Sequence, residues 1–227
     1  MSGKSAYAVI WDVDGTLVDT AELHFQAWTA LTREMKLPFT RADFNATFGW
    51  RNPEIISQLF GTVYTEQDVA EMGTRKEELY RSAARQGVKL VPGARALLEG
   101  LRDAGFKQAV GTSAPRENLD LILRLTDTER IFSAVVSMED TQRGKPDPQV
   151  FQVAAQRLGV APGNCVVMED AVAGVQAAKA AGMKCIAVRF AGHHPEAALA
   201  AAGADAVVGS LEQVSVEKVQ NLFGIGR

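Results

Sequence analysis

The chain contains 227 residues, of which 47% are hydrophobic and 22% are charged, and its formal net charge is -3. These are the proportions of a globular protein with a large core, and the slight negative balance disfavours nucleic acid or an anionic membrane as a partner, because both select a basic surface. We find no apolar run near the roughly 20 residues that span a bilayer and no secretory signal, so we expect a cytoplasmic protein whose partner is a small molecule.

Short apolar runs alternate with helical patterns along residues 90–227, and a similar run at 7–11 belongs to the same series. We expect strands at 7–11, 107–112, 134–138, 165–169, 184–189 and 206–208, and helices at 94–104, 118–125, 148–158, 172–181 and 195–202. Continuous apolar strands are typical of a parallel sheet that helices cover on both faces. The pattern therefore predicts an α/β fold, in which Cys165 and Cys185 are reduced core residues.

Residues 18–89 have a different texture, because they carry only helical signals. We expect one helix that Pro38 ends, a second near 55–60 and a third, polar one at 69–84. The apolar face of the first comprises Leu23, Ala27, Ala30, Leu31 and Met35. This segment is interpreted as a helical domain, 18–89, inserted into a core domain formed by 1–17 and 90–227.

Two carboxylates follow the first strand in the run Asp12-Val13-Asp14-Gly15-Thr16. Open parallel sheets bind ligands outside the carboxyl ends of their strands. Two acids pointing into one cavity would repel each other unless a cation lay between them, and Mg²⁺ takes such oxygen ligands. One carboxylate would then serve as a nucleophile and the other as an acid/base. The alternative is a turn in which an aspartate caps the following helix.

Three further strand ends carry polar groups: Ser113 after the second strand, Lys145 in a proline-bounded loop after the third, and Glu169-Asp170 after the fourth. Taken singly, the serine and Asp170 could be helix N-caps, and the lysine could be solvated. Together these groups supply a hydroxyl, a fixed positive charge and metal ligands beside the first carboxylate pair. That combination indicates a phosphoryl-transfer site.

These motifs, in this order and with a helical insertion after the first, resemble those of the haloacid dehalogenase (HAD) superfamily of phosphatases and phosphomutases. The resemblance implies a Rossmann-like parallel core with an inserted helical cap. It implies that Asp12 attacks phosphorus to form an aspartyl-phosphate, and that Asp14 protonates the leaving oxygen and then deprotonates the acceptor. The dehalogenases of this superfamily lack the second aspartate, so Asp14 favours phosphorus chemistry.

The same resemblance assigns the remaining groups of the core. Ser113 and Lys145 would hold the phosphoryl oxygens. The Mg²⁺ ligands would be Asp12, the Asp14 carbonyl and Asp170, with Glu169 adjoining.

The inserted segment resembles the β-phosphoglucomutase-like subfamily, through His24-Phe25-Gln26-Ala27-Trp28, Gly49-Trp50-Arg51-Asn52 and Arg75-Lys76-Glu77-Glu78. The resemblance implies substrate contacts from Thr16, His24, Trp28, Arg51, Lys76, Ala114 and Arg116. Without it, His24 is an ordinary helix residue and Lys76 a solvated one. The chain departs from the mutase pattern at Trp50 and at Pro115-Arg116, where a small residue and Ser-Lys are usual.

Three functions remain open from the sequence. The first is a Mg²⁺-dependent phosphatase of small phosphorylated metabolites such as sugar phosphates. The second is a β-phosphoglucomutase, and the third is a catalytically silent metabolite-binding protein. We expect a monomer, and we interpret His193-His194 as part of a surface loop.

Overall fold

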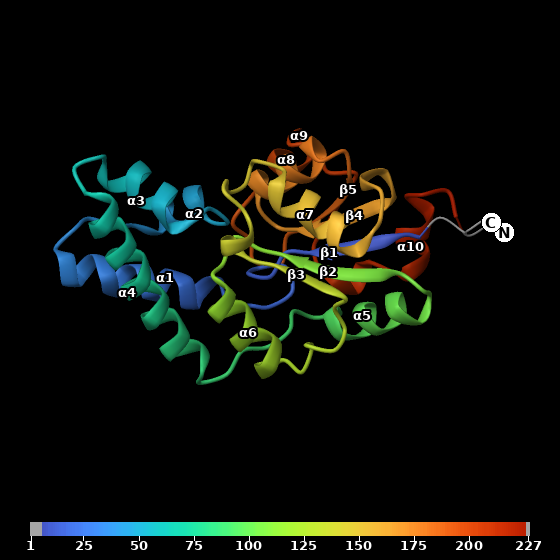
Figure 1. The fold of residues 1–227 in the computed structure, drawn as a ribbon, viewed down its shortest axis with the longest axis horizontal. Coiled ribbons are helices and arrows are strands. Elements are labelled where there is room, and N and C mark those ends of the chain that lie inside the picture. Colours follow the sequence, from blue (N-terminus) through green and yellow to red (C-terminus); the bar gives the residue numbers. More distant parts are fainter. Residues whose placement is uncertain (1–5, 226–227) are drawn as a thin grey trace.

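The computed structural model describes residues 6–225. Its centre is a six-stranded parallel sheet in the order β3-β2-β1-β4-β5-β6 (Figure 1). The strands are β1 (Ala8–Trp11), β2 (Lys107–Gly111), β3 (Ala134–Val136), β4 (Cys165–Glu169), β5 (Lys184–Val188) and β6 (Ala206–Val208). The strand order reverses at β1, which pairs with β2 on one side and β4 on the other. This reversal is the switch point at which open α/β sheets bind ligands.

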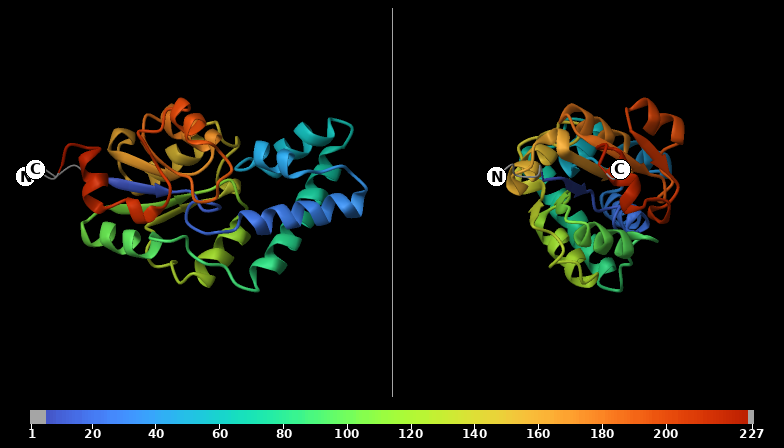
Figure 2. Two further views of the ribbon diagram at one scale, coloured as in Figure 1. Left: turned by 180° about the vertical axis from the view of Figure 1, so that it is seen from behind. Right: turned by 90° about the vertical axis from the view of Figure 1, so that its right-hand side faces the viewer.

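Helices cover both faces of the sheet (Figures 1 and 2). One layer contains α5 (Ala94–Asp103), α6 (Arg116–Leu125) and α10 (Val216–Asn221), and the other contains α7 (Gln149–Leu158), α8 (Val172–Ala180) and α9 (Glu196–Ala201). Side chains of β1 alternate between the two layers: Val9 and Trp11 pack with the first, Ala8 and Ile10 with the second, and all four are fully buried.

The four helices between β1 and α5 form a helical unit: α1 (Ala21–Met35), α2 (Arg41–Thr47), α3 (Asn52–Phe60) and α4 (Glu66–Ala84). The unit has a hydrophobic cluster of its own that includes Trp28, Phe44, Ile56 and Met72. Figure 1 shows it as a lobe beside the sheet, on the side to which β1 points.

The predicted α/β fold is confirmed, and every predicted strand is present within two residues of its expected ends. The first helix ends at Met35, where Lys36 adopts a left-handed conformation with φ of 57°, so Pro38 follows the end rather than causing it. The sequence analysis missed α2, α10 and three short 3-10 helices: η1 (Met138–Asp140), η2 (Pro162–Asn164) and η3 (Leu211–Gln213). Both cysteines are free and buried. Within residues 6–225, none of the helices is long and apolar enough to cross a membrane.

Candidate active site

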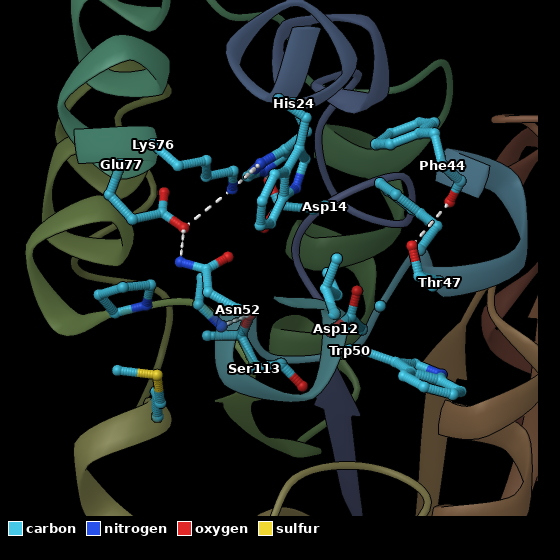
Figure 3. Close-up of a pocket in the computed structure, with 18 residues that line it drawn as sticks. Asp12, Asp14, His24, Phe44, Thr47, Trp50, Asn52, Lys76, Glu77 and Ser113 are labelled. Atoms are coloured by element: carbon cyan, nitrogen blue, oxygen red, sulfur yellow. Dashed lines mark hydrogen bonds and ion pairs between the residues drawn. The ribbon is translucent and has the colours of Figure 1, made fainter. Parts of the chain in front are cut away.

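The backbone coils tightly after β1 and turns two carboxylates toward one pocket. Asp12 still continues the sheet, since its N–H donates to the Met168 carbonyl at 3.0 Å. Gly15 then adopts φ of 85°, and a Cβ there would lie 2.2 Å from Oδ2 of Asp170, so only glycine fits. As a result, Asp12 and Asp14 line the same pocket, between the carboxyl end of the sheet and the helical unit (Figure 3).

Lys145 holds a buried positive charge against the first of these carboxylates. Its ammonium donates to Oδ1 of Asp12 at 2.5 Å and to Oε1 of Glu169 at 2.6 Å. Burial lowers the pKa of Lys145, but the two carboxylates outweigh burial and raise it above its usual value. Lys145 therefore stays charged beside Asp12.

Three buried carboxylates, Asp12, Glu169 and Asp170, offer ligand atoms that all lie within 4.8 Å of one another. Burial, together with the charge of Glu169, raises the pKa of Asp12 to about 8, although Lys145 acts in the opposite direction. Burial and the charges of Glu169 and Asp12 raise the pKa of Asp170 well above its usual range. Oδ2 of Asp170 is buried without a hydrogen-bond partner. The cluster therefore has the excess negative charge and the free oxygen that fit a divalent cation.

The carboxylate of Glu169 is held in place by the backbone at the start of α8. Oε2 of Glu169 accepts hydrogen bonds from the backbone N–H groups of Asp170 and Ala171, both at 2.7 Å. The space for this carboxylate exists because residue 174 is a glycine: a Cβ on Gly174 would lie 1.7 Å from Oε1 of Glu169.

Asp14 faces the helical unit rather than the cation cluster. Its Oδ1 accepts from the hydroxyl of Thr20 at 2.6 Å and lies 3.0 Å from Nε2 of His24. Burial raises the pKa of Asp14, but the charge and hydrogen bond of His24 outweigh burial and lower the pKa to about 2. Asp14 is therefore ionised while His24 lies against it.

Several sequence-predicted substrate contacts meet in the pocket. His24, Trp28 and Lys76 line it from the helical unit, and Ser113 and Ala114 line it from the end of β2 (Figure 3). Lys76 is buried, and its ammonium bonds to Nδ1 of His24 at 2.8 Å.

Three other predicted contacts lie outside the lining of this pocket. Thr16 is buried beneath it and donates to Oδ1 of Asp170 at 3.1 Å. Arg51 is turned toward the loop that precedes Lys145, where it donates to two main-chain carbonyls and one hydroxyl. Its partners are the carbonyl of Thr141 at 3.2 Å, the carbonyl of Arg143 at 2.9 Å and the hydroxyl of Thr141. Arg116 is exposed and pairs with Asp120 at 2.8 Å. Substrate contact by these three residues stays a prediction.

The sequence analysis did not name every lining residue as part of the site, and the buried polar pair Asn52 and Glu77 is among those that it missed. Both are at least nine-tenths buried, and Nδ2 of Asn52 donates to Oε1 of Glu77 at 2.8 Å. A signal existed for this face of α4. Met72, Lys76, Tyr80 and Ala84 recur every four residues, and this spacing puts the lysine on an apolar stripe with Glu77 beside it.

Comparisons with known proteins agree with this architecture. A model of the haloacid dehalogenase-like hydrolase family matches residues 9–188. Beta-phosphoglucomutase of Bacillus subtilis (strain 168) is 35% identical over 188 residues, which cover 80% of this chain and 82% of that protein. Phosphorylated carbohydrates phosphatase of Thermotoga maritima is 33% identical over 212 residues, which cover 93% of this chain and 98% of that protein. In fold, the chain is similar to beta-phosphoglucomutase from Clostridium difficile, with a TM-score of 0.87 at 24% identity over 96% of this chain and 97% of that one.

Proposed function

The chain belongs to the family of haloacid dehalogenase-like hydrolases, and we propose that it is a phosphatase of small phosphorylated sugars and related metabolites that works through an aspartyl-phosphate. The observation that carries the proposal is the position of Asp12. Its carboxylate lies at the floor of a pocket, 2.5 Å from the ammonium of Lys145, with Asp14 lining the same pocket. This arrangement brings a nucleophile, a fixed positive charge and an acid/base group to one place.

In the first step an oxygen of Asp12 forms a bond to phosphorus while the bond from phosphorus to the sugar oxygen breaks. Asp14 gives its proton to that leaving oxygen, and Ser113 and Lys145 hold the phosphoryl oxygens. In the second step Asp14 takes a proton from water, whose oxygen attacks phosphorus. Phosphate leaves, and the Asp12 carboxylate is restored. His24 keeps Asp14 ionised. Before the first step, therefore, His24 must either move away from Asp14 or transfer a proton to it.

We propose Mg²⁺ as the divalent cation of this site, held by Asp12 and Asp170 with the main chain of Asp14, and with Glu169 adjoining. The hard carboxylate oxygens and the free Oδ2 of Asp170 support this choice. When bound, the ion neutralises charge so that an anionic carboxylate and an anionic phosphate approach each other.

We propose that the helical unit acts as a cap that closes over the substrate, with 18–89 as a domain inserted into 1–17 and 90–227. Its separate hydrophobic cluster supports this division. Closure excludes water during attack and brings His24, Trp28 and Lys76 to the sugar. The 33% identity to a phosphatase of phosphorylated carbohydrates supports sugar phosphates as the substrate class.

The test is phosphate release with Mg²⁺ over a panel of sugar and polyol phosphates. We expect the enzyme to release phosphate from several of these compounds. Phosphate release should be lost in Asp12→Asn and after chelation of the metal. An unchanged rate in Asp12→Asn would overturn the aspartyl-phosphate. No release from any of the phosphates would favour the silent binding protein.

A mutase is the second candidate, favoured by the 35% identity to the Bacillus subtilis enzyme. There the aspartyl-phosphate passes its phosphoryl group to a second hydroxyl of a bound sugar phosphate. Conversion of β-glucose 1-phosphate to glucose 6-phosphate, well in excess of phosphate release, would identify this activity.

We further propose a cytoplasmic monomer. The two free, buried cysteines support a reducing compartment. Among residues 6–225, Val63 and Leu125 are the exposed large hydrophobic side chains, and two isolated residues do not make the apolar patch of an obligate dimer.

A further inference from the structure

A buried carboxylate lies on the wall of the pocket that the helical unit forms. Glu77 of α4 has a side chain only 7% exposed, and it lines the same pocket as Asp12 and Asp14. It accepts hydrogen bonds from Nδ2 of Asn52 at 2.8 Å and from Nδ2 of Asn118, in α6, at 2.6 Å. Figure 3 shows Glu77 on the opposite side of the pocket from Asp12 and Ser113. An acidic group therefore faces the end of a substrate that lies away from the reacting phosphate.

The lysine that bonds to Glu77 on this wall is already neutralised. The ammonium of Lys76 lies 2.8 Å from Oε1 of Glu77 and also bonds to Nδ1 of His24. Burial raises the pKa of Glu77, but the charges of Lys76 and His24 and the hydrogen bonds from Lys76 and Asn52 together outweigh burial, and the pKa falls below its usual value. Lys76 and Glu77 thus form an ion pair with no net charge to offer a second anion.

The two arginines that could have served a distal phosphate are engaged elsewhere. Arg51 is 9% exposed and bonds to the main chain at Thr141 and Arg143. The guanidinium of Arg116 pairs with Asp120 on the surface of α6. Neither side chain lines the pocket.

The groups that remain on this wall are acceptors of hydrogen bonds from hydroxyls. Glu77 already accepts three hydrogen bonds, so one of its roughly four acceptor positions remains, on Oε2, and in Figure 3 the amide oxygen of Asn52 points away from Glu77 toward the cavity. Sites built in this way favour a hydroxyl-bearing ligand. An anion placed at the same point loses its hydration and meets no free positive charge in return, because Glu77 already balances the charge of Lys76.

We infer that Glu77 makes the distal end of the pocket select neutral, hydroxyl-rich groups and exclude a second phosphate, so that the enzyme hydrolyses monophosphates of neutral sugars and polyols. The inference rests on the proposed function and deepens it. A phosphomutase must hold a bisphosphate, because Asp12 would transfer its phosphoryl group to a sugar that already carries one. In either orientation of that bisphosphate, one phosphate faces Glu77. The same residue therefore separates the phosphatase from the mutase.

The test compares kcat/KM, with Mg²⁺, for two matched pairs: fructose 1-phosphate with fructose 1,6-bisphosphate, and glucose 6-phosphate with glucose 1,6-bisphosphate. We expect the wild type to prefer each monophosphate by about 10-fold or more. Glu77→Gln removes the charge while keeping the shape, and should narrow this preference by about 10-fold. Glu78→Gln is the control, because it removes the same charge from the adjacent, exposed position that pairs with Arg75. It should leave the preference unchanged.

Equal turnover of both members of each pair by the wild type would overturn the inference while leaving the phosphatase intact. The inference would also be overturned if Glu77→Gln lowered kcat/KM by the same factor for every substrate, since a purely structural role has that effect. If Glu77→Gln does not fold, competition in the wild type decides. Fructose 1,6-bisphosphate should inhibit fructose 1-phosphate hydrolysis with a Ki at least about 10-fold above the KM of the monophosphate. A Ki near that KM would overturn the inference. Absence of phosphate release from every monophosphate would instead refute the proposed function, and this inference with it.

Discussion

The ammonium of Lys145 is shared between two buried carboxylates, which makes it a structural and a chemical group at once. Its side chain is 1% exposed. Removing one partner of a buried ion pair leaves the other partners uncompensated, which costs about 3 to 5 kcal/mol. For Lys145→Met we expect a loss of about 3 kcal/mol in the free energy of unfolding at pH 7.5 without metal, and a fall of about 10³-fold in kcat.

Urea unfolding at two pH values checks the stability part of this prediction. Lys145 lowers the pKa of Asp12, so without this lysine the carboxyl takes up a proton more readily, and the loss should be smaller at pH 5.5 than at pH 7.5. Lys184→Met is the control, since this lysine is 42% exposed and pairs with Asp205 on the surface. An equal loss at both pH values would contradict the charge argument.

Asp170 shows the opposite balance between stability and function. Its carboxylate is buried beside Glu169 and Asp12, and Oδ2 has no hydrogen-bond partner. In Asp170→Asn the like-charge repulsion disappears while Oδ1 still accepts from Thr16. We expect the metal-free protein to gain about 1 kcal/mol in stability, and the affinity for Mg²⁺ to fall.

Thermal unfolding in EDTA and in Mg²⁺ measures both effects of Asp170→Asn. The variant should unfold at a higher temperature than the wild type in EDTA, and it should gain less on adding Mg²⁺. A lower unfolding temperature in EDTA would mean that the carboxylate stabilises the fold without a cation.

At the scale of elements, the loop after β5 contacts the helical unit, and His193 is part of that contact. His193 is half-buried, its ring lies 4.4 Å from that of Phe48, and Nδ1 is 3.2 Å from Oδ1 of Asn45. The surface-loop interpretation of this segment was therefore right about the loop but missed its contact with α2. Burial, with the charges of His194 and Arg41, lowers the pKa of His193 from 6.5 to about 4.

This shift makes the contact sensitive to acid. The unfolded chain takes up a proton on His193 near pH 6.5, but the folded chain does so only near pH 4, so the unfolded state binds more protons in between. The free energy of unfolding should therefore fall as the pH is lowered from 6.5 to 4. Urea unfolding at pH 7.5, 6 and 5 should show a smaller fall in His193→Gln than in the wild type. Parallel curves would contradict the prediction.

The elements that sequence analysis found, and those that it missed, differ in the strength of their local pattern. The strands were found because most of each strand is a short apolar run, as at 165–168, where every residue is buried. α2 was missed because its seven residues hold few apolar positions, although Thr40 and Asp43 form a capping box at its start.

The core motifs follow strand ends and were therefore found by position. Glu77 was not, because a buried acid on a polar helix looks like a solvated one until Asn52 and Asn118 are seen to contact it.

At the scale of the whole molecule, the helical unit is bonded to the core by groups far apart in the sequence. Arg51 contacts the loop that leads to Lys145, and Arg81 of α4 donates to Oδ1 of Asn118 in α6 at 3.0 Å. A Cβ on Gly144 would lie 3.0 Å from Cδ of Arg51, so this loop leaves room for the guanidinium. If the helical unit closes as proposed, Arg51 couples that closure to the loop that positions Lys145.

If Arg51 acts by holding the helical unit closed, then substitutions of Arg51 and of its partner Thr141 should change KM in the same direction. Arg51→Ala removes all its bonds to the loop, and we expect KM to rise by about 10-fold for every substrate, including small ones such as acetyl phosphate. Thr141→Val removes only the hydroxyl acceptor and keeps the carbonyl, so it should raise KM in the same direction by about 2-fold to 3-fold. Small-angle scattering should show a larger radius of gyration for Arg51→Ala. If Arg51 instead contacts the substrate, Thr141→Val will have no effect on KM, and Arg51→Ala will spare acetyl phosphate, which is too short to reach it.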